Sequence, residues 1–304
     1  MPEVKKIPIN DDLSGQRLDN FLITELKGVP KSKIYSIIRK GEVRVNSKRK
    51  KPSYKLNEGD EIRIPPIRIT NKENHFVPSK IISLLKESII LENEDFIAIN
   101  KPSGIASHGG SRISIGVIEA IRNFGKDYRD AKLIHRLDKN TSGCQIIAKN
   151  NKFLRHCNRL ISERKVKKTY QAVVEGKWTI REGLYEINLE KNFLRGNERM
   201  VKINEGGKIA KTILEVIKKR DKFSLMKCEL ITGRTHQLRV QLSSLGYPII
   251  GDVKYGKKNI KKAEISQAKN RMYLHADSFI SKELDIKIFA DVPEEFKKIL
   301  KNDE

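Results

Sequence analysis

The chain has 304 residues, of which 38% are hydrophobic, so it can form one large and one smaller domain, each with its own core. Its 62 lysines and arginines outnumber 38 acidic residues, and the resulting formal charge of +24 favours a polyanionic partner. No stretch approaches the roughly 20 apolar residues of a membrane span, and the N-terminal sequence MPEVKKIPIN lacks the apolar segment of a signal peptide, so we expect a cytoplasmic protein.

Residues 1–66 are predicted to form two short helices followed by strands. Apolar residues recur at helical spacing within 18–26 and again within 32–40, and Gly41 should end the second helix. Apolar and polar residues then alternate at 42–46 and at 61–64, which predicts two strands separated by a basic turn.

The pattern of this small domain resembles the αL RNA-binding motif of the ribosomal S-four family. The resemblance covers RLDNFL (17–22), IIRKGEVRVN (37–46) and LNEGDEIRI (56–64). It implies that a set of cations contacts RNA phosphates, namely Arg39, Lys40, Arg44, Lys48, Arg49, Lys50 and Lys51. Such contacts add affinity that falls with salt and carries little sequence information. The alternative is a solvated basic face, the commoner meaning of a charge run.

Residues 67–88 carry mixed charge and no clear period until the apolar residues at 81–85, so we expect a linker there, followed by a second domain at 89–304. Its predicted strands lie near 89–91, 96–99, 143–148, 169–175, 212–217, 223–231, 272–280 and 285–290. Its predicted helices lie near 117–121, 153–161 and 235–245, and Thr235 should cap the last. Strands dominate without strict alternation, so we predict an α+β protein with a mixed, mainly antiparallel sheet and flanking helices.

One run of this second domain, HRLDKNTSG at 135–143, places a lone carboxylate, Asp138, between Arg136 and Lys139. The run follows an apolar pair and ends in Ser-Gly, which predicts a strand, then a charged loop, then a turn. An isolated carboxylate in a basic loop is a candidate nucleophile. Taken alone, however, Asp138 is more simply an ordinary turn aspartate.

The surrounding motifs resemble the pseudouridine synthases of the RluA type. Four runs in order carry the resemblance: EDFIAINKPSGIASHGG (94–110), HRLDKNTSG (135–143), KKTYQAVVEG (167–176) and LITGRTHQLRVQLSSLGYPIIGDVKYG (230–256). Further stretches at 108–110, 116–122 and 189–212 are closer to the RluC branch, which modifies large-subunit ribosomal RNA. The resemblance implies that a uridine within RNA is isomerised, its base being cut from the sugar, turned and rejoined through a ring carbon. It implies no cofactor, and we also expect no metal and a monomer.

The resemblance also assigns roles to individual residues. Asp138 would be the catalytic aspartate, acting either as a nucleophile at the sugar or ring or as a base that removes a sugar proton. Arg234 matches the ion-pair partner that keeps this carboxylate charged. Tyr170 matches the active-site tyrosine whose ring packs on the uracil. Arg136 matches the basic residue that takes up the space left by the flipped nucleotide.

Simpler interpretations exist for several of these residues. Tyr170 alternates with apolar neighbours and could be a core aromatic, while Arg234 could be a surface phosphate contact. We interpret His135 and His236 as positioning or RNA-contact residues rather than acid-base catalysts. At the level of function, the alternatives are a non-catalytic RNA-binding assembly factor and the same reaction on transfer RNA.

Other enzyme classes lack their sequence signatures. The three cysteines form no CxxC pair and no Cys/His cluster, so neither a disulfide framework nor a zinc site is indicated. The chain contains neither GxSxG with the spacing of an esterase nor the GxxxxGK[ST] run of a phosphate-binding loop.

Overall fold

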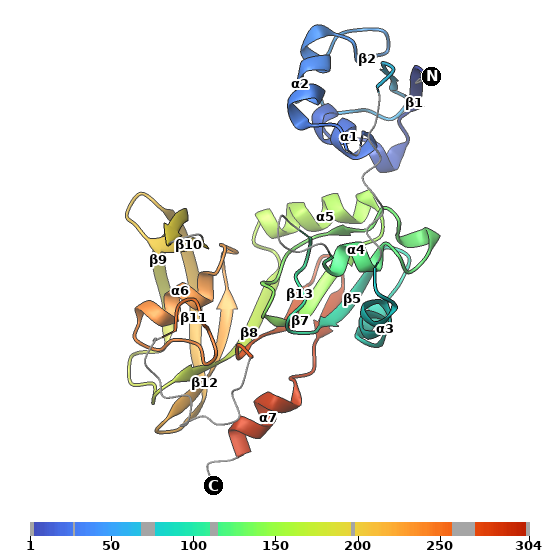
Figure 1. Ribbon diagram of the computed structural model, residues 1–304. Coiled ribbons are helices and arrows are strands. Elements are labelled where there is room, and N and C mark those ends of the chain that lie inside the picture. Colours follow the sequence, from blue (N-terminus) through green and yellow to red (C-terminus); the bar gives the residue numbers. More distant parts are fainter. Residues whose placement is uncertain are drawn as a thin grey trace. The chain divides into compact units, whose positions relative to one another are not determined.

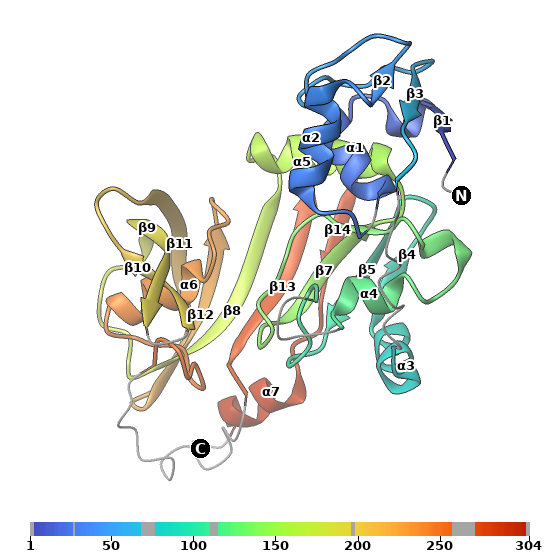
Figure 2. The ribbon, with the colours of Figure 1, turned by 45° about the horizontal axis from the view of Figure 1, so that its top comes forward.

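The computed structural model describes residues 3–26, 28–67, 77–109, 115–195, 198–256 and 271–301. The chain divides into two compact units, which Figures 1 and 2 show from two directions. The smaller unit comprises 1–76 and 150–155, and the larger comprises 77–149 and 156–304.

The smaller unit packs two helices and a three-stranded antiparallel sheet around an apolar core. Its elements are β1 (Lys5–Pro8), a 3-10 turn (Asp11–Leu13), α1 (Leu18–Glu25), α2 (Lys31–Lys40), β2 (Arg44–Val45) and β3 (Glu61–Ile64). The sheet order is β1-β3-β2. The apolar faces of α1 and α2 are buried against Val45 and Ile62, as their helical spacing predicts. Gly41 ends α2 with a φ of 71°, a left-handed conformation that glycine adopts without steric cost.

The larger unit is built on one mixed sheet. Its strands are β4 (Ile89–Glu92), β5 (Phe96–Lys101), β6 (Lys132–Leu133), β7 (Ser142–Ala148), β8 (Lys167–Glu175), β9 (Gly183–Arg195), β10 (Glu198–Ile203), β11 (Lys208–Lys219), β12 (Phe223–Leu230), β13 (Leu274–Ser281) and β14 (Ile286–Phe289). The main path runs β10-β9-β11-β12-β8-β13-β7-β5-β4, with β14 on β13 and β6 on β7. Among the described strands, only the β13–β7 pair is parallel. The predicted α+β class with a mixed, mainly antiparallel sheet is therefore confirmed.

Helices cover parts of this sheet and complete its cores. They are α3 (Ser79–Glu87), α4 (Val117–Ile121), a 3-10 turn (Lys126–Tyr128), α5 (Asn151–Ser162), α6 (Gln237–Ser244) and α7 (Glu294–Lys301). Leu238 and Leu242 of α6 are buried against Ala172, Leu214 and Met226, which come from β8, β11 and β12. In the described part of the chain, no helix combines the length and hydropathy needed to cross a membrane.

The predicted linker at 67–88 needs correction in its second half. Residues 79–87 form α3, and Leu85 is fully buried in a core with Ile97 and Ile147 of the larger unit. The apolar run at 81–85 spans little more than one helical turn, so the sequence alone did not separate this helix from a linker. Residues 68–76 of the predicted linker lie outside the described residues.

Candidate active site

The four predicted motifs meet at a cleft of about 1020 Å³ in the larger unit. Its lining comes from segments within 106–109, 133–139, 161–170 and 230–236, together with Lys191. Six of the lining side chains are lysine or arginine, namely Arg136, Lys139, Arg164, Lys168, Lys191 and Arg234. Among the described lining residues the single carboxylate is that of Asp138. The cleft can therefore accommodate a polyanion around one acidic group.

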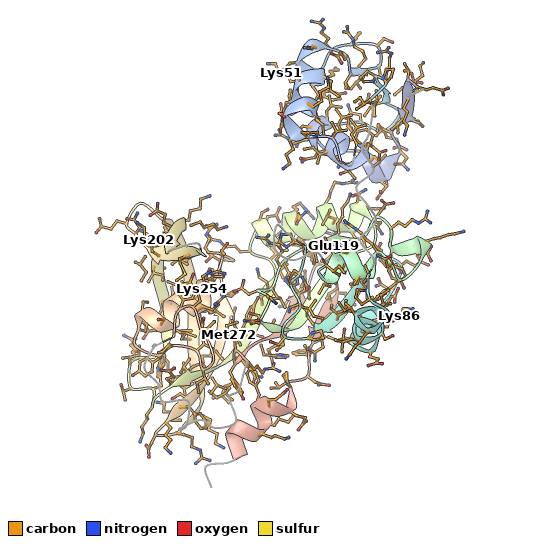
Figure 3. All side chains as sticks on the ribbon, viewed as in Figure 1. Lys51, Lys86, Glu119, Lys202, Lys254 and Met272 are labelled. Carbon is orange, nitrogen blue, oxygen red and sulfur yellow. The ribbon has the colours of Figure 1, made fainter. Side chains whose placement is uncertain are left out.

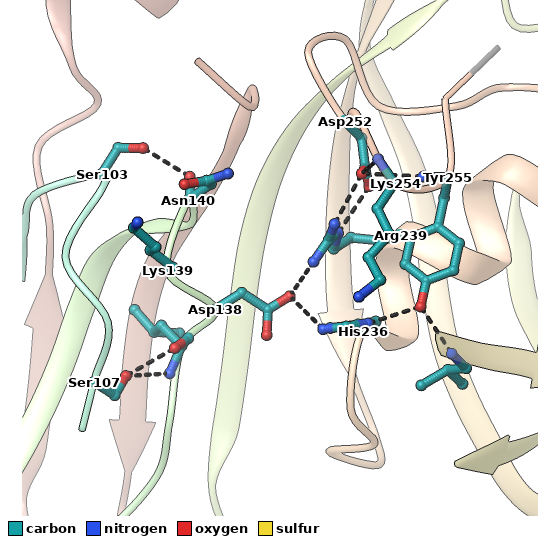
Figure 4. Close-up of polar contacts among 12 residues, drawn as sticks. Ser103, Ser107, Asp138, Lys139, Asn140, His236, Arg239, Asp252, Lys254 and Tyr255 are labelled. Carbon is teal, nitrogen blue, oxygen red and sulfur yellow. Dashed lines mark hydrogen bonds and ion pairs between the residues drawn. The ribbon is translucent and has the colours of Figure 1, made fainter. Parts of the chain in front are cut away.

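The backbone on both sides of Asp138 is fixed by hydrogen bonds. The buried Ser107 hydroxyl donates to the carbonyl of Leu137 at 2.8 Å and accepts from the N–H of the same residue at 2.9 Å. The side-chain amide of Gln145 on β7 donates to the same hydroxyl at 2.9 Å. The carbonyl of Asp138 accepts from the N–H of Thr141 at 3.1 Å, which closes the turn before β7. Figure 4 shows the Ser107 contacts beside Asp138.

A buried lysine also binds the backbone of the loop that carries Asp138. The Lys101 ammonium donates to the carbonyls of Pro102 at 2.9 Å, Ile105 at 2.7 Å and Lys139 at 3.3 Å. Burial lowers the pKa of Lys101 to about 7, and the negative charge of Asp138 acts in the opposite direction. Lys101 thus ties the KPSG turn to the loop that carries the carboxylate.

Replacing Lys101 by methionine is expected to lower the free energy of unfolding by about 2–4 kcal/mol, because three part-buried carbonyl acceptors lose their donor. The exposed Lys139 side chain provides the control, since Lys139→Met removes a charge nearby at a cost of less than about 0.5 kcal/mol. Urea unfolding of both variants measures the difference. Equal stabilities would contradict a supporting role for Lys101.

The cation that pairs with Asp138 is Arg239, and the predicted pairing with Arg234 is wrong for this structure. Arg239 Nη1 lies 2.8 Å from Asp138 Oδ2, and the rest of its guanidinium binds Asp252 through two hydrogen bonds of 2.8 Å (Figure 4). Arg234 precedes α6, and its Nε donates to the carbonyl of Ile209 at 3.1 Å instead. Arg234 still lines the cleft.

Burial makes the pairing of Arg239 strong. Its side chain is 10% exposed and that of Asp252 only 1%. Burial alone would raise the pKa of Asp252, but the hydrogen bonds and charge of Arg239 hold it below its usual value. Burial likewise disfavours the charge of Arg239, yet Asp252 and Asp138 together keep its pKa raised. Arg239 is therefore a permanent cation that holds the Asp138 carboxylate in place.

A signal for Arg239 was present in the sequence. It lies between the apolar residues Leu238 and Val240 near the start of α6. An arginine at such a position is rarely buried without a carboxylate partner.

Tyr170 forms part of both the core and the cleft wall. Its side chain on β8 is 8% exposed and packs in the cluster that contains Leu137 and Leu238. Burial and the nearby charge of Asp138 raise the pKa of Tyr170, so its hydroxyl stays protonated. The position of this ring beside the carboxylate suits contact with a planar base.

The neighbouring side chains of Arg136 and His135 lie in different environments. Arg136 is exposed in the cleft, and its Nη1 lies 3.3 Å from Nε2 of His108. Nε2 of His135 accepts from the N–H of Ile146 at 3.1 Å, and its ring stacks on Phe279 with centroids 5.5 Å apart. Burial lowers the pKa of His135 to about 3, so this histidine is neutral and holds the loop against β7.

His236 lies at the start of α6, where Thr235 was expected to be the cap. His236 is itself the N-cap residue, with a φ of 53° and no side-chain capping bond, so the Thr235 assignment is wrong. Nε2 of His236 lies 3.7 Å from Asp138 Oδ2, and Nδ1 lies 2.7 Å from the hydroxyl of Tyr255. Burial lowers the pKa of His236, although the charge of Asp138 opposes the shift.

In the smaller unit, the predicted basic residues lie in the last turn of α2 and in the segment 44–51 that follows it. Arg39 and Lys40 lie in its last turn, and the side chain of Arg49 crosses Gly41 so closely that a Cβ there would lie 2.3 Å from Nε. Five of the seven predicted side chains are exposed, namely Arg39, Lys40, Lys48, Arg49 and Lys51 (Lys51 is labelled in Figure 3). Arg44 and Lys50 are half-buried. Cations also suit the negative end of the helix dipole.

The three cysteines, Cys144, Cys157 and Cys228, are free thiols within the core. Over the described ranges, no group of three or more His, Cys, Asp or Glu residues is arranged to hold a metal ion.

Comparisons with known proteins match both units. The family model described as RNA pseudouridylate synthase matches residues 95–244, and the S4 domain model matches 16–62. The protein of Pasteurella multocida named ribosomal large subunit pseudouridine synthase C is 42% identical over 303 residues, which cover 98% of this chain and 93% of the relative. The Escherichia coli K12 protein of the same name is 43% identical over 279 residues, which cover 90% of this chain and 88% of the relative.

Solved structures share the fold. Human RNA Pseudouridylate Synthase Domain Containing 4 matches with a TM-score of 0.62 and 23% identity, over 73% of this chain and 94% of that chain. Human RNA Pseudouridylate Synthase Domain Containing 1 matches with a TM-score of 0.54 and 28% identity, over 68% of this chain and 83% of that chain.

Proposed function

This chain belongs to the RNA pseudouridylate synthase family, and we propose that it isomerises uridine to pseudouridine in large-subunit ribosomal RNA with Asp138 as the catalytic residue. The observation that carries the role of Asp138 is its position as the single carboxylate among the described lining residues of a cationic cleft. The names of the two bacterial relatives support ribosomal RNA as the substrate.

The reaction breaks the bond between N1 of uracil and C1′ of the sugar and forms a bond between C5 and C1′. C5 releases its hydrogen as a proton and N1 takes up a proton, so the product is an isomer of the substrate. Asp138 acts either as the nucleophile or as the base that removes a sugar proton. Both routes use the carboxylate, which Arg239 holds in place through a hydrogen bond of 2.8 Å.

The remaining cleft residues would bind and orient the nucleotide. A base in folded RNA must leave its stack before it reaches the carboxylate. The neutral, buried Tyr170 offers its ring as one wall for the uracil, and the exposed guanidinium of Arg136 can stack in the space that the base leaves. Arg234 would contact phosphate or sugar at the cleft rather than Asp138.

The smaller unit would hold the RNA while the larger one modifies it. The S4 domain match at 16–62 supports the proposal that residues 1–66 form an RNA-binding domain. We propose that the enzyme acts as a monomer, because one copy of the chain supplies Asp138, its cation Arg239 and the cleft around them. Because its substrate would be ribosomal RNA, we place the enzyme in the cytoplasm.

Release of tritium from uridine labelled at C5 tests the proposed function. The label leaves only when the new carbon bond forms, so unmodified large-subunit ribosomal RNA should release it and transfer RNA should not. Release from transfer RNA alone would reassign the substrate. Tight binding of both RNAs without any release would favour a non-catalytic assembly factor.

Replacing Lys48, Arg49, Lys50 and Lys51 together by alanine should weaken RNA binding and flatten its salt dependence. Each lost phosphate contact reduces the slope of log K against log salt by about 0.7, so the slope should fall by up to about 3. A matched variant loses four exposed lysines outside the cleft, at Lys282, Lys287, Lys297 and Lys298. Equal slopes in the two variants would refute the phosphate role of the basic turn.

A further inference from the structure

A line of polar contacts runs from β10 to Asp138. It is separate from the ion pair between Asp138 and Arg239. The N–H of Val201 lies 2.9 Å from the hydroxyl oxygen of Tyr255, which lies 2.7 Å from Nδ1 of His236. Nε2 of the same histidine faces Asp138 Oδ2 at 3.7 Å. Figure 4 shows these groups in a row beside Arg239.

The direction of the first two contacts follows from their chemistry. A backbone N–H can only donate, so the Tyr255 oxygen accepts from Val201. Burial raises the pKa of Tyr255, which keeps its hydrogen on the oxygen. Within the described residues, Nδ1 of His236 is the acceptor available to this hydrogen, so the hydroxyl donates to Nδ1.

The tautomer of His236 follows from that direction. A neutral imidazole with an acceptor at Nδ1 carries its hydrogen on Nε2, the nitrogen that faces Asp138. The opposite tautomer would turn a lone pair toward the carboxylate. At 3.7 Å the N–H is slightly too far for a direct hydrogen bond, and an approach of less than 1 Å would form one.

The local structure holds Tyr255 in this position. Its N–H donates to Asp252 Oδ1 at 3.2 Å, and its carbonyl accepts from the Ser243 hydroxyl at 2.6 Å. The guanidinium carbon of Arg239 lies 5.1 Å from its ring centroid, in the range of a cation–π contact. The ring is therefore fixed by the residues that also fix the Asp138 partner.

The backbone of β10 and of the first residue before α6 allows the contacts of Tyr255 and His236. The register of β10 shifts between Met200 and Val201, and a bulge of this kind frees a backbone N–H from the ladder. His236 adopts the left-handed conformation at the position of the helix cap without giving a capping bond. Such conformations are uncommon outside glycine, and they persist where surrounding contacts require them.

We propose that Tyr255 fixes the tautomer of His236 so that its Nε2–H faces Asp138, which makes both of them positioning residues for the catalytic carboxylate. This inference rests on the proposed function, since it concerns the carboxylate that performs the reaction. His236 acts through Asp138 and transfers no proton to the substrate.

Tyr255→Phe keeps the ring and removes the hydroxyl, so the single-turnover rate of tritium release should fall about five- to tenfold, the equivalent of one hydrogen bond. The KM for RNA should stay unchanged. Tyr247→Phe is the matched control, because the Tyr247 hydroxyl also makes two contacts, to Thr179 at 3.1 and 2.8 Å, and does not line the cleft. An unchanged rate in Tyr255→Phe would overturn the proposal.

Variants at position 236 test whether His236 acts by presenting an N–H to Asp138 or only by packing. The amide nitrogen of glutamine reaches the place of Nε2 without help from Tyr255, whereas that of asparagine reaches only the place of Nδ1. His236→Gln should therefore keep most of the activity and His236→Asn should lose it. Adding Tyr255→Phe to His236→Gln should cause no further loss, and a second equal loss would overturn the proposal.

Tritium release by the wild-type enzyme shows whether the proposed function or only the positioning role of His236 has failed. If it releases no tritium from any RNA, the proposed function fails and the positioning role falls with it. If it does release tritium and His236→Asn is as active as His236→Gln, the positioning role alone fails.

Discussion

Replacement of Asp138 by asparagine is expected to abolish pseudouridine formation while leaving RNA affinity nearly unchanged. Asparagine keeps the shape of the side chain, but it can neither attack the sugar or ring nor remove a proton. We expect tritium release to fall by at least about a thousandfold, as the loss of a nucleophile does in other enzymes. Affinity should stay within about a factor of two, because phosphate contacts to lysine and arginine carry most of it.

The fold should tolerate this change. Arg239 keeps both of its hydrogen bonds to Asp252, so the cation does not become unpaired. Asp221→Asn is the control, since Asp221 also pairs with a cation, Lys177 at 3.1 Å, and is not part of the cleft. Normal turnover in Asp138→Asn would end the catalytic assignment, whichever of the two routes is considered.

The sequence was sufficient to identify the loops that form the cleft. Asp138, Tyr170 and Arg136 each lie within a short run whose motif also sets the local backbone, and all three line the same cleft. Their roles remain proposals, but their proximity follows from the order of the strands that carry them. Helices and buried strands were similarly predictable where apolar periodicity was strong, as in α2 and β7.

Pairing between side chains was less predictable, because it depends on how α6 lies against the sheet. Arg234 and Arg239 are five positions apart in one motif, and only the helix phase decides which of them reaches Asp138. The contacts of His236 depend on a β10 backbone N–H released by a shift in register. Strands β9 and β10 themselves were not predicted, because dense charge in 189–212 masks their alternation.

Arg239→Gln should reduce both stability and turnover, whereas Arg234→Gln should leave stability nearly unchanged. The Arg239 guanidinium serves two carboxylates, and the Asp252 side chain is only 1% exposed. Removing one partner of a buried pair costs about 3–5 kcal/mol, because the remaining charge is left without compensation. Arg234 donates one hydrogen bond to a backbone carbonyl, and its loss should cost about 1 kcal/mol or less.

Stability and chemistry can be separated with Arg239→Lys and with the double variant Arg239→Gln, Asp252→Asn. Lysine keeps a charge but cannot form the fork that binds Asp252 twice, so both stability and rate should be intermediate. The double variant removes the stranded carboxylate and should recover much of the stability, yet turnover should stay low because Asp138 still lacks its cation. Urea unfolding and single-turnover tritium release, measured below the unfolding temperature of every variant, provide the two readouts. If Arg234→Gln lost turnover and Arg239→Gln kept it, the pairing first expected from the motif would hold for catalysis, and the contact at 2.8 Å would be structural only.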